Sequence, residues 1–226
     1  MIPWRLIDTA PVPGGQNDLR LMRRGAEFSI MLGQNQLMNS RLSGSEEALA
    51  TIACKRIEAT ERPVLLIGGL GMGFTLRAAL AVLGPKARIV VAELMPAVVK
   101  WARGAMAEIF GDSLTDSRII VREADVIDLI QSSPSTFDAI LLDVDNGPAG
   151  LTRDANNRLY HLNGLADAHA ALRPGGVLAV WSSESDQNFT SRLRKSGFLV
   201  EEVRVRANGA RGGARHVIWI ASRPHN

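Results

Sequence analysis

Cysteine is almost absent from this sequence, which has a single thiol, Cys54, among 226 residues. One cysteine forms no internal disulfide and no zinc cluster by itself, so a reducing compartment is expected. No apolar run approaches the roughly 20 residues that span a bilayer, and Met1–Arg5 lacks the apolar core of a signal peptide. We therefore expect a cytoplasmic protein without a membrane partner.

Metal-ligand patterns, internal repeats and blocks of like charge are also missing. The histidines, His161, His169, His216 and His225, have no spacing typical of a metal site, so we expect no metal and assign them no role. The net charge is only +3, but residues 186–226 contain eight basic and three acidic residues. This basic tail is either a solvated surface or a binding site for an anionic partner such as RNA.

The composition is that of a globular chain, with 46% hydrophobic and 22% charged residues. Short segments before Pro63 predict a small antiparallel hairpin or meander, and a helix that Ser45 caps follows at residues 48–57. The expected strands of this part are residues 19–24, 27–32 and 36–39. Because residues 1–60 are too few for a large core, we expect an extension that packs on a domain of residues 61–226.

After Pro63, apolar strands alternate with helices. The expected strands are residues 64–67, 88–92, 118–121, 137–142, 177–181, 198–206 and 216–221. The expected helices are residues 74–83, 96–109, 126–130, 155–172 and 188–196. Such alternation is typical of a parallel sheet covered on both faces, and the last two strands must pair antiparallel because no helix separates them. The sequence predicts an α/β, Rossmann-like class I methyltransferase fold: a seven-stranded, mostly parallel sheet with one antiparallel strand, plus a short N-terminal β-hairpin extension.

A glycine-rich turn joins the first strand of this domain to its helix, with Gly68, Gly69, Gly71 and Gly73 in it. Glycines allow a tight turn and close approach to a ligand, and the helix N-terminus offers free N–H groups. Glu93 ends the second strand, where a carboxylate can accept hydrogen bonds from ribose hydroxyls. The alternative is a connecting turn without a ligand.

Three aspartates follow the third and fourth strands. Asp125 either accepts a hydrogen bond from an adenine amino group or caps the next helix. Asp143 and Asp145 follow strand 137–142 at the edge where doubly wound sheets bind ligands. There a carboxylate can bind a cationic amine and remove its proton, and two close carboxylates can split their pKa values. The alternative is a turn in which both acids cap backbone N–H groups.

Together these residues resemble the spermidine synthase (polyamine aminopropyltransferase) family, a branch of the class I methyltransferase fold with an N-terminal β-hairpin extension. The segments that resemble the family are Val64–Gly73, Val90–Pro96, Phe137–Asp143, Gly147–Ala149, Leu159–Tyr160 and Leu172–Gly176. The resemblance implies transfer of an aminopropyl group from decarboxylated S-adenosylmethionine to an amine such as putrescine. It makes Glu93 the ribose-binding acid and Asp143, with Asp145 beside it, the group that deprotonates the amine.

The sequence also departs from that family. Gly71 stands where the family's glycine loop has an aspartate that holds the donor's amino group, and Asn146-Gly147 replaces an Asp-Pro pair. Residues 44–59 lack the family's Tyr-His-Glu, and its second aromatic after Tyr160 is replaced near Leu165. The adenosine half of the site is therefore retained, whereas the amine half is not.

These observations leave three hypotheses. The first is a transferase that uses S-adenosylmethionine or its decarboxylated form and passes an aminopropyl group to a small-molecule amine. The sulfonium of the donor supplies the leaving group, so this reaction requires no metal. The second is an S-adenosylmethionine-dependent methyltransferase acting on a small molecule or RNA. The third is a non-catalytic nucleoside-binding protein. The resemblance further implies a homodimer, with the extension as interface or as a lid on the acceptor side.

Overall fold

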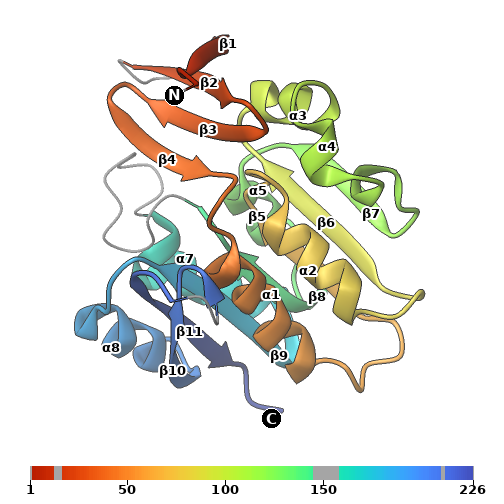
Figure 1. Cartoon of the computed structure of the whole chain (residues 1–226). Coiled ribbons are helices and arrows are strands. Elements are labelled where there is room, and N and C mark those ends of the chain that lie inside the picture. The colour runs from red at the N-terminus through yellow and green to blue at the C-terminus, as the bar shows by residue number, and fades with distance from the viewer. Residues whose placement is uncertain (1, 13–16, 145–157, 210–211, 226) are drawn as a thin grey trace.

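The computed structural model describes residues 2–12, 17–144, 158–209 and 212–225 and contains two β-sheets (Figure 1). The N-terminal sheet is antiparallel, in the order β1-β2-β3-β4. Its strands are β1 (Arg5–Pro11), β2 (Asp18–Arg24), β3 (Glu27–Leu32) and β4 (Asn35–Asn39). The helix α1 (Gly44–Arg56) connects this sheet to the second one.

The second sheet has seven strands in the order β10-β11-β9-β8-β5-β6-β7. They are β5 (Val64–Gly68), β6 (Arg88–Glu93), β7 (Ile119–Glu123), β8 (Phe137–Leu142), β9 (Leu172–Ser182), β10 (Leu199–Arg206) and β11 (Arg215–Ser222). The pairs among β7, β6, β5, β8 and β9 are parallel, whereas β11 runs antiparallel to both β9 and β10. The predicted seven-stranded, mostly parallel sheet with one reversed strand is confirmed.

Helices cover both faces of this sheet, because its strand residues alternate between two apolar layers. In β5, Leu65 and Ile67 pack in one cluster with α1, α2 and α3, whereas Leu66 packs with α5, α7 and α8. These helices are α2 (Phe74–Val82), α3 (Pro96–Arg103), α5 (Val126–Gln131), α7 (Leu162–Ala171) and α8 (Gln187–Lys195). Two short helical turns, α4 (Ala107–Phe110) and η1 (Ser113–Thr115), lead into β7.

The N-terminal extension is larger than the predicted hairpin or meander, because β1 adds a fourth strand. Its side chains alternate weakly and are mostly exposed, which explains why the sequence pattern missed it. The Asp8 carboxylate anchors this edge strand, since it accepts hydrogen bonds from Trp101 Nε1 and Lys100 Nζ, each at 2.9 Å. The bond from Trp101, followed by that from Lys100, lowers the pKa of Asp8 to about 2.

The extension shares one apolar core with the larger sheet. Leu21 and Phe28 of the extension belong to the same buried cluster as Leu49 of α1 and Ile67 of β5. Cys54 of α1 is fully buried in the same cluster. The expected packing of residues 1–60 on the rest is therefore observed, while a domain boundary at residue 60 stays a prediction.

Several element boundaries differ from those predicted. The single helix at residues 96–109 is wrong, because α3 ends at Arg103, Gly104 is its C-cap and α4 follows separately. The helix predicted to reach residue 172 ends at Ala171, and β9 begins at Leu172, five residues before the predicted strand. Ser45 is not an N-cap: α1 begins at Gly44, and Ser43 precedes it without a side-chain cap. Within the described ranges, no helix combines the length and apolarity needed to cross a membrane.

Asp138 joins three neighbouring strands at the end of the sheet opposite the glycine turn. Its Oδ2 accepts hydrogen bonds from the Val64 backbone N–H at 2.7 Å and from Arg173 Nη1 at 2.8 Å. Because Asp138 is 8% exposed, its loss leaves a polar group of the sheet without its partner.

We expect Asp138→Ala to lower the free energy of unfolding by about 1–3 kcal/mol, the usual cost of an unsatisfied buried donor. Urea denaturation followed by circular dichroism measures the change. Glu58→Ala, an exposed acid next to the end of α1, serves as the control and should stay within about 0.5 kcal/mol of the native protein. Equal effects of the two substitutions would contradict this role.

Candidate functional site

A cavity of about 310 Å³ lies between the N-terminal sheet and the carboxyl ends of β5, β6 and β8. Apolar side chains of β2, β3 and β4 form one wall, and the ends of the parallel strands form the other. Five residues predicted from sequence line it: Gly69, Gly71, Glu93, Asp125 and Asp143. The topology thus brings the predicted residues together at the expected edge of the sheet.

The glycine turn is packed tightly from two sides. A Cβ at Gly71, where φ is +50°, would lie 2.7 Å from Cε of Met38, which extends from β4 over the turn. A Cβ at Gly73, where φ is +75°, would lie 2.4 Å from Cε1 of Phe110. Gly68 and Gly73 do not line the cavity, so their part is in packing, whereas Gly69 and Gly71 face the space where a ligand would lie.

Glu93 ends β6 with its carboxylate at the cavity and only 7% of the residue exposed. The Leu70 backbone N–H donates to Oε2 at 2.9 Å and the Met95 N–H donates to Oε1 at 2.8 Å. Burial raises the pKa of Glu93, and the N–H donors of Met95 and Leu70 oppose this shift. The backbone N–H groups of Gly71 and Leu94 oppose the shift more weakly. A carboxylate has about four lone-pair sites, and the hydrogen bonds from Leu70 and Met95 use two of them, so the group can still accept hydrogen bonds from a diol.

Asp125 has the capping role that the sequence offered as one of two alternatives. Its Oδ1 accepts a hydrogen bond from the Ile127 N–H at 2.9 Å at the start of α5. It also lines the cavity, next to Ala124 and Val126. The structure therefore shows the cap, and an adenine contact stays a prediction.

Asp143 directly follows β8 and lies at the floor of the cavity. Its Oδ2 accepts a hydrogen bond from Thr75 Oγ1 at 2.7 Å, which ties it to the first turn of α2. Burial raises the pKa of Asp143, and the hydroxyl of Thr75 opposes this shift. Asp145, the second predicted catalytic acid, lies outside the described residues.

Asn39, Ser45, Glu46 and His216 are polar residues of the cavity wall that were not assigned to the site from sequence, and the last three of them are in contact. Ser45 Oγ donates to Glu46 Oε2 at 2.7 Å and lies 3.0 Å from His216 Nδ1. Burial and then the charge of Asp143 raise the pKa of Glu46 to about 7. The Ser-Glu-Glu run was interpreted as a helix start, and nothing local in the sequence links it to His216.

Among the described residues, no group of three or more His, Cys, Asp or Glu side chains is arranged to bind a metal ion. The lining residues of the cavity also include no lysine or arginine within the described part of the chain. The site therefore combines an apolar wall with carboxylates, a histidine and backbone N–H groups, a combination that suits a ligand with a cationic part.

Comparison with known proteins gives similar sequences and a similar fold. No family model matches the chain. It is 30% identical over 153 residues to a polyamine aminopropyltransferase of Mycobacterium tuberculosis, which is 64% of this chain and 28% of that protein. It is 33% identical over 127 residues to polyamine aminopropyltransferase 2 of Pseudomonas aeruginosa, which is 54% of this chain and 34% of that protein. These matches thus span about a third or less of the relatives' length.

Solved structures match over nearly the whole chain. Spermidine synthase from Thermotoga maritima has a TM-score of 0.75 at 17% identity, over 98% of this chain and 74% of that one. A probable spermidine synthase from Corynebacterium glutamicum has a TM-score of 0.63 at 17% identity, over 96% and 79%. At this identity the likeness establishes the fold, and the sequence matches point to the same group of proteins. The chain is therefore similar in fold to the spermidine synthases, with a class I methyltransferase-like architecture, and over part of its length it is similar in sequence to the polyamine aminopropyltransferases.

Proposed function

We propose that this chain is a transferase that binds an adenosyl sulfonium donor and passes its aminopropyl group to a small-molecule amine. The observation that supports this most is the Glu93 carboxylate, buried at the tip of β6 and lining the cavity beside Gly71. Two hydroxyls of a ribose can donate to such a carboxylate, and the glycine turn lets the rest of the donor pass close to the backbone. Relatives that match in sequence are named polyamine aminopropyltransferases, and one structural neighbour, of TM-score 0.74, is a spermidine synthase in complex with the transition-state analogue AdoDATO.

The charge of the cavity favours the decarboxylated form of the donor. A carboxylate on the donor would find no lysine or arginine among the described lining residues, and it would meet the acids Glu46 and Asp143. Like charges in a site of low polarity repel strongly. The same acids favour a cationic amine as the acceptor, so both substrates fit the electrostatics of the cavity.

The reaction we propose needs positioning and one proton transfer. The amine nitrogen attacks the carbon bound to the sulfonium, the C–S bond breaks, and a neutral thioether leaves. An ammonium acceptor must first lose a proton, and Asp143 lies at the end of β8 where a ligand-bound amine would meet it. In-line placement of the two substrates supplies most of the rate enhancement.

Calorimetry with both donors tests this function. We expect decarboxylated S-adenosylmethionine to bind at least about tenfold more tightly than S-adenosylmethionine, which corresponds to about 1.4 kcal/mol. Equal or tighter binding of the unmodified donor would favour methyl transfer. If neither donor binds, only the non-catalytic hypothesis remains.

The contribution of Glu93 can be separated from fold stability by a conservative change. We expect Glu93→Gln to weaken donor binding about 10- to 100-fold, because a charged acceptor for the ribose hydroxyls is lost. Glu123→Gln is a matched control, since Glu123 pairs with Glu93 at the same register of β7 but is exposed and outside the cavity. Donor affinity of Glu93→Gln within twofold of the native protein would remove Glu93 from the donor site.

We also propose that the protein is a cytoplasmic homodimer that uses the extension as its interface. The edge strand β1 exposes Leu6 and Ile7, at 54% and 43%, and an unpaired apolar edge is suited to pairing with a second copy. Light scattering should give about twice the chain mass of 24.4 kDa, and Leu6→Lys should shift it toward the monomer. A monomer for the native protein at micromolar concentration would contradict this assembly.

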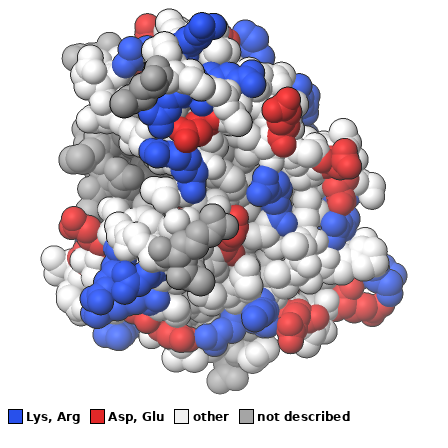
Figure 2. All heavy atoms as spheres, in the orientation of Figure 1, with Lys and Arg blue, Asp and Glu red and all other residues white. Residues whose placement is uncertain are grey.

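An RNA partner stays a prediction. Arg204, Arg206 and Arg215 are exposed on β10 and β11, and Figure 2 shows basic side chains on this side of the molecule with acidic ones among them. Such mixing is common on solvated surfaces.

A further inference from the structure

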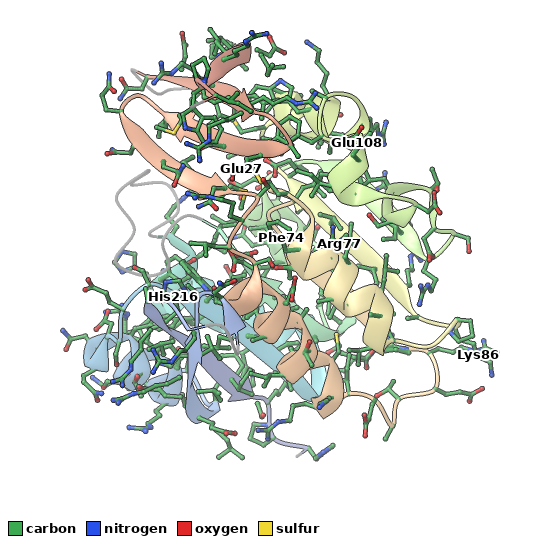
Figure 3. All side chains as sticks on the ribbon, viewed as in Figure 1. Glu27, Phe74, Arg77, Lys86, Glu108 and His216 are labelled. Atoms are coloured by element: carbon green, nitrogen blue, oxygen red, sulfur yellow. The ribbon has the colours of Figure 1, made fainter. Side chains whose placement is uncertain are left out.

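A chain of hydrogen bonds connects the cavity to the strand β11. Ser45 Oγ donates to Glu46 Oε2 at 2.7 Å, and His216 Nδ1 lies 3.0 Å from the same Ser45 oxygen. Ser45 is buried, whereas His216 is half-buried at the start of β11. Figure 3 shows His216 on β11 beside the first turn of α1, so two segments far apart in sequence meet here. The contacts provide a path from a cavity carboxylate to a group near the surface.

Glu46 and Asp143 form a pair of acids at the inner end of this path. Thr75 Oγ1 donates to Asp143 at 2.7 Å and lies 3.4 Å from the Glu46 backbone oxygen, so it holds the two residues together. The negative charge of Asp143, and with a weaker effect that of Glu47, raises the pKa of Glu46. Neither lysine nor arginine is among the described residues that line the cavity. Two close carboxylates with no cation between them favour sharing a proton.

The same end of the cavity contains a donor that lacks a partner. Trp181 lines the cavity and is 9% exposed, and its Nε1 has no hydrogen-bond partner among the described residues. Its ring meets that of His216 edge to face, with centroids 4.8 Å apart. An unsatisfied buried N–H is costly, so an acceptor atom of a ligand or a water would be stabilised there. This observation points to a ligand at the end where Glu46 and His216 lie.

We propose that Glu46 is the proton acceptor for the incoming amine, paired with Asp143, and that Ser45 and His216 deliver this proton to solvent. The proposal rests on the proposed transferase function. The ammonium gives one proton to the ionised Glu46 carboxylate, and the neutral amine then attacks the sulfonium-bound carbon. Glu46 passes the proton to Ser45 Oγ, whose own proton moves to Nδ1 of a neutral His216. The imidazolium then releases its Nε2 proton to water. Exchange with solvent returns the neutral ring to the tautomer protonated on Nε2, which restores the Nδ1 acceptor, and the net product is one proton per turnover.

The ionisation of the two end groups suits this direction of transfer. A carboxyl with a pKa of about 7 accepts and releases a proton near neutral pH, where a general base is most effective. Burial lowers the pKa of His216, which favours the neutral ring and makes an imidazolium formed there release its proton readily to water. Ser45 links the two, since its hydroxyl contacts both.

Kinetics of four variants in the complete enzyme test the proposal. We expect Glu46→Gln to lower kcat at least about 100-fold at saturating donor and to remove the acidic limb of the pH–rate profile near pH 7. The control is Glu58→Gln, an exposed acid just after α1 and outside the cavity lining, which should leave both kcat and profile unchanged. Ser45→Ala and His216→Phe should slow turnover about tenfold, and added imidazole should restore part of the loss in His216→Phe. A Glu46→Gln enzyme that keeps kcat within twofold and retains the acidic limb would overturn the proposal.

A measurement on the free protein separates this proposal from the proposed function. Carbon-13 NMR should show the Glu46 carboxyl titrating near pH 7, and Asp143→Asn should lower its midpoint toward the ordinary 4.5. Because the pKa is raised on folding, the folded chain retains a proton that the unfolded chain loses between pH 4.5 and 7. Native stability should therefore fall across this window relative to Glu46→Gln. Titration of Glu46 near 4.5 would overturn the proposal even where donor binds, whereas failure of donor binding with titration near 7 would remove the transferase function alone.

Discussion

The Glu93 carboxylate is the contact on which the geometry of this site depends. It accepts N–H groups from Leu70 of the glycine turn and from Met95 before α3, so one side chain joins the connections after two adjacent strands. The positive-φ turn at Gly69, Gly71 and Gly73 is also held to β6 by the Gly69 N–H, which donates to the Ala92 carbonyl at 2.8 Å, and Glu93 adds the side-chain part of this connection. Burial of a carboxylate is costly and raises the pKa of Glu93, and the backbone N–H groups of Met95, Leu70, Gly71 and Leu94 offset that cost only in part. The remaining cost is what a ligand with two hydroxyls can relieve, which explains how a fold-defining contact can also be a binding group.

The N-terminal sheet has a part in the site that its small size conceals. Met38 of β4 lies over Gly71, and the apolar side chains of β2 and β3 form the wall opposite the parallel strands. An apolar wall facing carboxylates reduces the local polarity, and low polarity strengthens every charge interaction in the cavity. The extension therefore affects the charge interactions of the acids in the site as well as the shape of the cavity. Its edge strand β1 is held in place by the hydrogen bond from Trp101 Nε1 to the Asp8 carboxylate.

Sequence patterns anticipated the large sheet because every strand of the βαβ units has a continuous apolar run bounded by a turn signal. The predicted site residues beyond those strands also met in one cavity, since parallel strands place their carboxyl ends at one edge. Patterns failed where contacts over long distance in sequence decide the structure. β1 is a strand because β2 pairs with it and Trp101 holds Asp8, and Gly104 splits the predicted helix that begins at Pro96. No local signal could join Ser45 to His216, because the contact forms only when β11 inserts between β9 and β10.

Residues 44–59 lack the Tyr-His-Glu run that the resembled family has there, yet the structure places two polar side chains from this same stretch in the cavity. Glu46 and Ser45 begin α1, which packs on α2 and on the sheet, so the first turn of α1 is held against Asp143 and Thr75. A missing motif is therefore not the same as a missing site, because a helix of the same placement can present different polar groups to the same space. Two acids that share a proton carry one negative charge between them, which is enough to bind a cationic group. Burying one charge in the empty cavity costs less desolvation free energy than burying two. The absence of lysine and arginine from the described lining follows from the same requirement, since a nearby cation would keep both acids ionised and remove the proton acceptor that neutral pH otherwise supplies.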